Sequence, residues 1–124
     1  MPRLQFIVSD SLDPFLNIAV ENYLVSHVET DNVVLYLWRN RRTVVIGQNQ
    51  NPYSECNVEL LEAEGGHLMR RCTGGGAVYH DDGNLNFSFV APESLYSQPL
   101  QFSTLVGAVQ SYGLRCELSG RNDV

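Results

Sequence analysis

Residues 69–90 read MRRCTGGGAVYHDDGNLNFSFV, and this stretch guides the interpretation of the whole chain. Two arginines lead into three consecutive glycines, and a histidine and two aspartates follow. A glycine run costs conformational entropy on folding, so it usually marks backbone that takes a positive φ or passes close to another group. The flanking segments HLMRR and AVYH are typical of strands, and NLNFSFV (84–90) alternates behind a DDG turn. The centre of the chain is therefore predicted to be mostly sheet, with a glycine loop inside it.

An anion is the ligand that this loop favours. Successive backbone amides of a glycine loop can form a concave nest for phosphate or carboxylate oxygens, and a neighbouring arginine adds a charged fork. The loop is not a Walker loop, because no GK[ST] follows, and it is not a dinucleotide fingerprint, because its glycines do not open a helix. A loose hairpin turn is the structural alternative. The arginines before the glycines and the His-Asp pair after them favour the anion site.

The composition decides how such an anion could be held. The chain has 124 residues, a net charge of −6 and a pI near 4.8, so nonspecific attraction to nucleic-acid phosphate or an anionic membrane is disfavoured. All eight basic residues are arginines, and the chain therefore contains no lysine. An anion must be bound locally, and a step that needs a lysine ammonium must obtain it elsewhere.

Cysteine usage and the N-terminus favour a cytoplasmic protein. Cys56, Cys72 and Cys116 are an odd number without CxxC spacing, which argues against a disulfide framework and a zinc site. No stretch has the apolar length of a transmembrane helix, and MPRLQFIVSDS lacks the hydrophobic core of a signal peptide. We expect reduced thiols, no membrane and no nucleic-acid partner.

Apolar periodicity predicts three helices. Asp13 and Pro14 form a helix start, and the apolar stripe behind them contains Leu16, Ala19, Val20, Tyr23, Leu24 and His27. A second helix opens at Pro52 and closes at Gly65 and Gly66, and a third occupies 102–112. The first of these helices is expected to lie at the surface and pack on a sheet.

The strand pattern predicts one α+β domain. VVLYLW (33–38) and TVVIG (43–47) are expected to be buried strands joined by a hairpin turn at RNRR, and the other predicted strands are 4–8, 67–71, 77–80, 84–90 and 114–118. The fold class is α+β, with a mixed, largely antiparallel sheet flanked by helices. The chain ends in SGRNDV, which is turn-like rather than a finished element, so 1–124 is interpreted as part of a domain.

Four ordered motifs resemble the lipoate-protein ligase A family. They are SDSLDPFLNIAVENYL, LYLWRNRRTVVIGQNQNPYSECN, MRRCTGGGAVYHDDGNLNFSFV and GRND. This family has the biotin/lipoate ligase fold, which is similar to the catalytic domain of class II aminoacyl-tRNA synthetases. The resemblance covers essentially the whole chain, so residues 1–124 are expected to be the N-terminal part of a single catalytic domain, incomplete at the C-terminus.

The resemblance implies an ATP-dependent lipoate-protein ligase. Such enzymes use ATP and Mg²⁺ to activate lipoate to lipoyl-AMP. They then transfer the lipoyl group to a lysine of the lipoyl domains of 2-oxoacid dehydrogenase E2 subunits or of the glycine cleavage H protein. An adenylated carboxylic acid is an anion, in agreement with the glycine loop.

The resemblance also implies the site residues. Arg71 is the expected contact to the carboxylate or phosphate, and Asp123 is a weak candidate for Mg²⁺, because that ion prefers oxygen ligands. Trp38, Val45 and Ile46 could supply the apolar wall for the lipoyl tail. The expected ATP and lipoyl-adenylate site consists of Arg70, Arg71, Gly74, Gly75, Gly76, Ala77, Val78, Tyr79, Asn122 and Asp123.

The sequence departs from the family in one respect. The ligases carry an essential lysine downstream of GRND, which is expected to lie beyond Val124, the last residue of this chain. No catalytic residue is therefore expected in these 124 residues, which should be inactive alone, and an uncovered sheet edge could allow self-association.

Two alternatives to a ligase remain open. One is an octanoyl- or lipoyltransferase that uses Cys72, and the other is a non-catalytic lipoyl- or adenylate-binding partner. His80 is interpreted as structural, Cys72 as a small loop residue, and Arg41 and Arg42 as part of a solvated turn.

Overall fold

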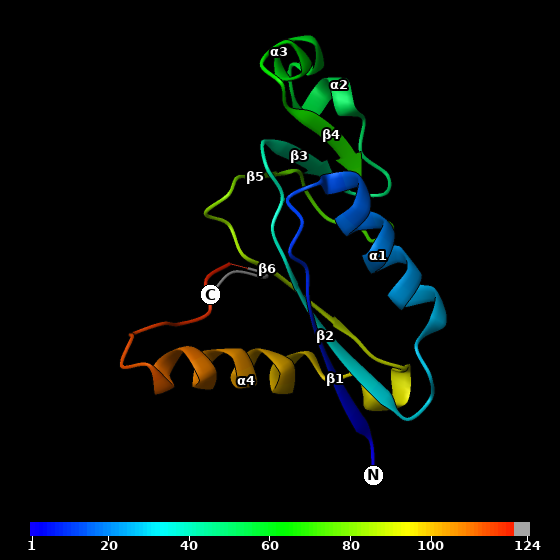
Figure 1. Ribbon diagram of the computed structural model, residues 1–124, viewed down its shortest axis with the longest axis vertical. Helices are drawn as coiled ribbons and strands as arrows, with labels where there is room; N and C mark the ends of the chain where they lie inside the picture. The colour runs from blue at the N-terminus through cyan, green and yellow to red at the C-terminus, as the bar shows by residue number, and fades with distance from the viewer. Residues whose placement is uncertain (121–124) are drawn as a thin grey trace. The chain divides into compact units, whose positions relative to one another are not determined.

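The first part of the chain contains two three-stranded sheets. The computed structural model (Figure 1) describes residues 1–120, and the chain divides into two units, residues 1–92 and 93–124. In the first sheet β2 (Asn32–Trp38) lies between two neighbours. It is parallel to β1 (Arg3–Val8) and antiparallel to β6 (Asn86–Val90).

The second sheet repeats this arrangement with shorter strands. β3 (Thr43–Ile46) is its middle strand, parallel to β4 (His67–Arg70) and antiparallel to β5 (Val78–His80). The prediction of an α+β fold with mixed sheets flanked by helices is confirmed. Each sheet contains one parallel and one antiparallel pair, so neither direction dominates.

The predicted hairpin at RNRR is wrong, because β2 and β3 belong to different sheets. The chain crosses between the sheets there, and it crosses back after β5 through a turn in which Asn84 N donates to Asp81 O at 3.1 Å. An ion pair of 3.0 Å between Arg41 and Asp82 links the two crossings, and Arg39 Nη1 donates to Asp82 O at 3.2 Å. The polar residues therefore form a joint between sheets.

Helix α1 (Pro14–His27) begins where the sequence predicts, since the Asp13 carboxylate accepts a hydrogen bond from Phe15 N. Its buried face differs from the predicted stripe. Asn17 and Ile18 are buried, whereas Leu16 and Tyr23 are 50% and 62% exposed. Hydrogen bonds between Asn17 and neighbouring segments make a polar residue acceptable at the centre of this face, and apolar periodicity cannot detect them.

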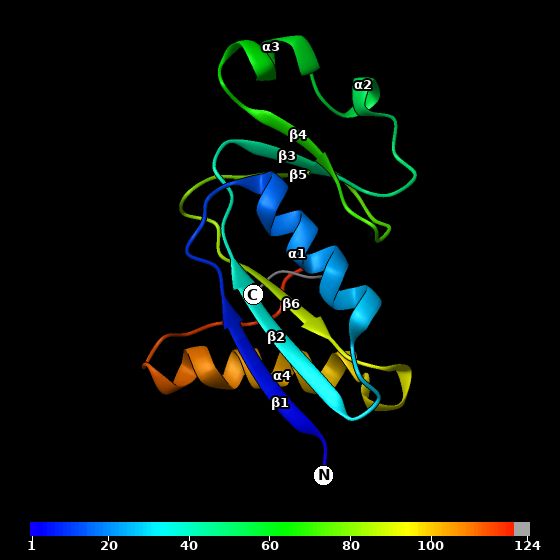
Figure 2. The same cartoon turned by 45° about the vertical axis from the view of Figure 1, so that its right-hand side comes forward.

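The hydrophobic core lies where α1 meets both sheets. Figure 2 shows α1 running past both sheets. Its buried members are Ile18 of α1, Tyr36 and Trp38 of β2, and Val45 of β3. Partly buried side chains that pack against them are Ile7, Val20, Leu24 and Met69. Helix α1 therefore holds the two sheets in a fixed relation.

The helix predicted from Pro52 is two short helices, α2 (Pro52–Glu55) and α3 (Val58–Ala63). Asn57 separates them because its side chain caps the second helix, accepting from Leu60 N at 3.1 Å. The predicted end is confirmed: Gly66 N donates to Leu61 O at 2.8 Å, the bond that closes many helices.

The second unit contains a 3₁₀ turn, η1 (Glu93–Leu95), and the helix α4 (Gln98–Ser111). The strand predicted at 114–118 is wrong, since this segment is neither helix nor strand. It contacts α4 instead, with Gln110 Nε2 donating to Cys116 O at 3.4 Å. Within residues 1–120, no helix has the length and apolar character needed to cross a membrane.

Candidate functional site

The glycine run joins the two outer strands of the second sheet. It leaves β4, passes the end of the middle strand β3, and enters β5 on the other side (Figure 1). Arg71 N donates to Ile46 O at 3.0 Å, which holds the start of the run against the end of β3. Because β4 and β5 do not pair with each other, the glycine run is not a hairpin turn.

A positive φ explains the glycine at position 75. Its φ is 103°, and an ideal Cβ there would lie 2.7 Å from Arg71 Nη2. Gly74 and Gly76 have no heavy atom within 4 Å of an ideal Cβ, so their surroundings are open. The run therefore combines one glycine whose positive φ disfavours a side chain with two that leave space beside the backbone.

Arg71 binds the carbonyl groups of this loop. Its Nη2 donates to Gly74 O at 2.9 Å and to Gly76 O at 2.7 Å, and its Nε donates to Gly74 O at 3.1 Å. Within residues 1–120, the amides of Gly74, Gly75 and Gly76 donate no hydrogen bond. The loop thus directs carbonyls to the arginine and keeps three amide donors for another group, as an anion site requires.

Arg70 faces a different loop. Its Nη1 donates to the carbonyls of Gly47, Gln48 and Gln50 at 3.1, 3.0 and 2.8 Å. The two neighbouring arginines, both expected in the adenylate site, therefore hold two separate segments of backbone.

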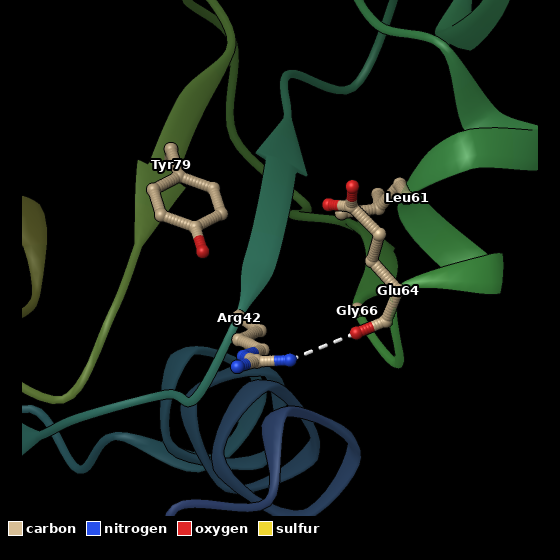
Figure 3. A pocket seen from close by; sticks show the side chains of 5 residues that line it. All are labelled: Arg42, Leu61, Glu64, Gly66 and Tyr79. Atoms are coloured by element: carbon tan, nitrogen blue, oxygen red, sulfur yellow. Dashed lines mark hydrogen bonds between the residues drawn. The ribbon is translucent and has the colours of Figure 1, made fainter.

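The structure places the predicted residues of β5 on two faces of the sheet. Val78 and His80 share one face, and Tyr79 points to the other by strand alternation. Tyr79 lines an open groove of about 610 Å³ together with Arg42, Leu61, Glu64 and Gly66 (Figure 3). No residue of the glycine run lines this groove. The Tyr79 ring is therefore separated from the glycine loop, and only its backbone continues that loop.

His80 is buried in a chain of polar side chains. Its Nδ1 lies 3.2 Å from Asn40 Nδ2 and 3.4 Å from Asn86 Nδ2, and Asn40 Oδ1 accepts from Asn17 Nδ2 at 3.1 Å. Since an amide NH₂ group can only donate, Nδ1 is an acceptor and the proton of the neutral ring lies on Nε2. Burial, and then the Arg71 guanidinium, lower the pKa of His80 below its usual 6.5. This geometry supports a structural interpretation of His80.

The other candidates within the described chain are a thiol and two guanidinium groups. Cys72 is exposed and unpaired. Arg41 pairs with Asp82, and Arg42 Nη1 donates to Glu64 O at 2.9 Å, so both guanidinium groups have partners within the chain. Among residues 1–120, no cluster of three or more His, Cys, Asp or Glu could hold a metal ion.

The candidates at the C-terminal end lie outside the described residues. These are Asn122 and Asp123, expected near the nucleotide, and the chain end at Val124, beyond which the family lysine is expected. The structure describes residues 1–120, so the roles of Asn122 and Asp123 and the position of the lysine beyond Val124 stay predictions.

Sequence reasoning missed the loop that follows β3. An ideal Cβ on Gly47 would lie 2.2 Å from Gly75 O, and Gln48 N donates to Thr73 O at 2.9 Å. The two loops therefore touch directly. A signal was present in the sequence, because a glycine ends the buried strand TVVI and four amide residues, QNQN, follow it.

Two curated relatives align with this chain along their N-terminal parts. The lipoate-protein ligase A of Bdellovibrio bacteriovorus is 46% identical over 124 residues, and that of Psychrobacter cryohalolentis is 42% identical over 122. These alignments cover 100% and 98% of this chain but only 37% and 36% of the relatives. The chain thus spans little more than a third of their length.

Solved structures show the same fold. P. falciparum LipL1 in complex with lipoate aligns with a TM-score of 0.84 and 32% identity over 96% of this chain and 39% of that one. A lipoate-protein ligase A bound with ATP aligns at 0.79 and 30% over 99% and 51%. A bipartite lipoate protein ligase of Thermoplasma acidophilum, described with its E2 lipoyl domain, aligns at 0.76 and 28% over 96% and 49%.

The family model of the lipoyl protein ligase A/B catalytic domain matches residues 13–124. These residues include α1, every strand of the two sheets except β1, and the whole glycine loop. This match spans most of the chain, and the chain therefore belongs to the lipoyl protein ligase A/B catalytic domain family.

Proposed function

We propose that the protein containing this chain is an ATP-dependent lipoate-protein ligase. It would activate lipoate to lipoyl-AMP with release of pyrophosphate and pass the lipoyl group to an acceptor lysine. Family membership and the lipoate- and ATP-bound neighbours support this reaction. The observation that carries the proposal is the glycine loop, where three amides without partners in the described chain adjoin a guanidinium. This is the polar environment that an acyl phosphate anion needs.

Each part of the loop has a role in this proposal. The backbone from Gly74 to Tyr79 would bind phosphate and carboxylate oxygens of the adenylate. Arg71 would keep the carbonyls of Gly74 and Gly76 turned away from the anion. Its Nη1, which makes only a 3.5 Å contact to Val45 O in the described chain, is the nitrogen left to contact the ligand.

The assignment of residues to the apolar wall for the lipoyl tail needs one change. Val45 and Trp38 belong to the same buried cluster, whereas Ile46 points to the opposite face of β3. We therefore assign the wall to Trp38 and Val45.

Two further assignments rest on the resemblance alone. Asn122 and Asp123 would lie near the nucleotide, with Asp123 as an oxygen ligand for Mg²⁺. The essential ammonium must come from outside these 124 residues, from a lysine beyond Val124 or from another chain, because the chain contains no lysine. We accordingly expect this segment alone to bind but not to turn over substrate.

The acceptors would be lipoyl domains of 2-oxoacid dehydrogenase E2 subunits and the glycine cleavage H protein, in the cytoplasm. The Thermoplasma neighbour described with its E2 lipoyl domain supports the first of these partners.

The transferase alternative requires an acyl group on Cys72. This thiol is exposed, but no hydrogen bond joins it to a base within residues 1–120. Mass spectrometry after incubation with an acyl donor distinguishes the two reactions, since a Cys72→Ser variant would lose any thioester adduct.

The test of the ligase proposal is binding of a non-hydrolysable lipoyl-adenylate analogue to the full-length protein, measured by calorimetry. Arg71→Ala should weaken binding by about tenfold or more, the effect of one charge-assisted hydrogen bond. Arg39→Ala, which removes an exposed arginine at the crossing between sheets, is the matched control. Equal affinity of Arg71→Ala and the parent protein would contradict the assignment of the loop.

A further inference from the structure

We propose that Arg70 is a positioning residue, which holds the loop of residues 47–50 in the shape against which the glycine loop forms. The inference rests on the proposed function, in which the glycine loop binds an adenylated acid. It gives the two adjacent arginines different tasks: Arg71 belongs to the anion loop itself, and Arg70 acts on that loop through a second one.

The contacts of Arg70 converge on one nitrogen. Its Nη1 lies 3.1 Å from Gly47 O, 3.0 Å from Gln48 O and 2.8 Å from Gln50 O. All three acceptors are backbone carbonyls of one short segment. A cation at the point where the three carbonyls converge forms charge-assisted hydrogen bonds with them. These bonds hold residues 47–50 in a curve around the guanidinium group.

The segment is also ordered from within. Gln50 Oε1 accepts from Gly47 N at 2.8 Å, and Gln50 N donates to Gly47 O at 3.2 Å. Gly47 and Gln50 therefore close a small ring of backbone and side chain. Arg70 completes this ring, because it binds the Gly47 and Gln50 carbonyls from outside.

Two contacts join residues 47–50 to the glycine loop. Gln48 N donates to Thr73 O at 2.9 Å, immediately before the glycines. The Gly47 Cα approaches Gly75 so closely that a Cβ would lie 2.2 Å from its carbonyl oxygen. A shift of residues 47–50 must therefore move Thr73 or Gly75.

The geometry predicts which substitutions Arg70 tolerates. Arg71 donates to Gly74 O from Nε and to Gly76 O from Nη2. This arrangement needs the planar fork of a guanidinium group. Arg70 acts as a point donor through one nitrogen, and a lysine ammonium with three N–H groups can replace it. Arg70→Lys should therefore preserve the loop, whereas Arg70→Met, with similar length and no donor, should not.

The experiment uses the full-length protein and two measurements. Amide hydrogen exchange at Gly47 and Gln48, without ligand, reports the order of the loop. Calorimetry with the non-hydrolysable lipoyl-adenylate analogue reports the site. Arg70→Met should accelerate exchange and weaken binding by about tenfold each, whereas Arg70→Lys should stay within about threefold of the parent for both. Arg42→Met, which removes an arginine bonded to the Glu64 carbonyl at the end of α3, should leave exchange at Gly47 and Gln48 unchanged.

Two results would overturn the inference. One is unchanged exchange and affinity in Arg70→Met. The other is an Arg70→Lys variant with parental exchange but affinity as weak as that of Arg70→Met, because this would mean a direct forked contact to the ligand. If the parent protein does not bind the analogue, the proposed function fails, while the exchange data still decide the role of Arg70.

Discussion

The Cα of Gly47 lies so close to Gly75 that an ideal Cβ on Gly47 would be 2.2 Å from the Gly75 carbonyl oxygen. The two glycines are 28 positions apart in the sequence, and they join the loop after β3 to the loop after β4. A methyl carbon does not approach a carbonyl oxygen this closely in normal van der Waals contact. One missing methyl group is therefore a condition for the observed form of the glycine loop.

Gly47→Ala should destabilise the protein by about 1–3 kcal/mol, as overpacking does when backbone must move. Gly74→Ala is the matched control for stability, because no atom lies within 4 Å of its ideal Cβ. It should change the free energy of unfolding by less than about 0.5 kcal/mol. Urea denaturation of both variants provides the measurement, and equal stability of the two would show that the loops separate easily.

Asn17 should be one of the most sensitive polar positions in the chain. It is fully buried, and its side chain bonds to Ser9, Tyr36, Asn40 and the carbonyls of Ser11 and Arg39. Asn17→Ala removes these five hydrogen bonds from a buried network, so we expect a loss of about 2–4 kcal/mol in the free energy of unfolding.

The exposed Asn49 provides the comparison for Asn17. Asn49→Ala should leave the urea midpoint almost unchanged, because surface substitutions away from buried networks have small effects. If Asn17→Ala were as stable as Asn49→Ala, water would have to replace the buried network.

Local signals in the sequence predicted most helices and strands, but they did not predict which strands pair with each other. The β-branched runs at β2 and β3 and the Asp13 cap specify their own conformations, so the sequence was sufficient there. Which strands pair depends on contacts that are distant in the sequence. The link at RNRR has the composition of a hairpin turn, yet Arg41 bonds to Asp82 across the joint between the sheets.

The candidate site also contains residues that local sequence indicates and residues whose roles depend on distant contacts. The glycine run and the two arginines before it were proposed as an anion site from the residues themselves, because such a run usually marks a positive φ or a close approach. The contact role of Arg71 came from the family resemblance, and both roles stay predictions. The roles of Asn17 and Asn40 could not be predicted, because each depends on packing against a distant segment. The loop at Gly47 carries a signal in its sequence, but its contact with Gly75 is visible only in the fold. A buried polar residue on an apolar face is recognised only when its partners are known.

The stability of the protein should depend on pH through His80. Burial and Arg71 lower the pKa of His80 in the folded state below 6.5, while the unfolded chain keeps the usual value. Between these two pKa values the unfolded state binds the extra proton, so stability is fully present above about pH 6.5 and decreases as the pH falls toward the folded-state pKa. His80→Gln should remove this part of the pH dependence.

Urea unfolding at several pH values between about 5 and 8 measures the slope, a range in which most carboxylates keep their charge. The exposed His27 offers the control variant His27→Gln, which should retain the slope of the parent protein. A parental slope in His80→Gln would show that another group titrates in this range.

The outer edge of β1 should cause self-association when residues 1–124 are produced alone. Within the described sheet β1 pairs only with β2, and its side chains Leu4, Phe6 and Val8 are 72%, 62% and 55% exposed. An unpaired strand edge with an apolar face is a template for pairing with another chain. Phe6→Lys should therefore shift sedimentation velocity profiles toward monomer, whereas Tyr53→Lys, which removes an exposed aromatic ring on α2, should not. A segment that remains monomeric at high concentration, or an equal response of both variants, would show that β1 is not the surface responsible.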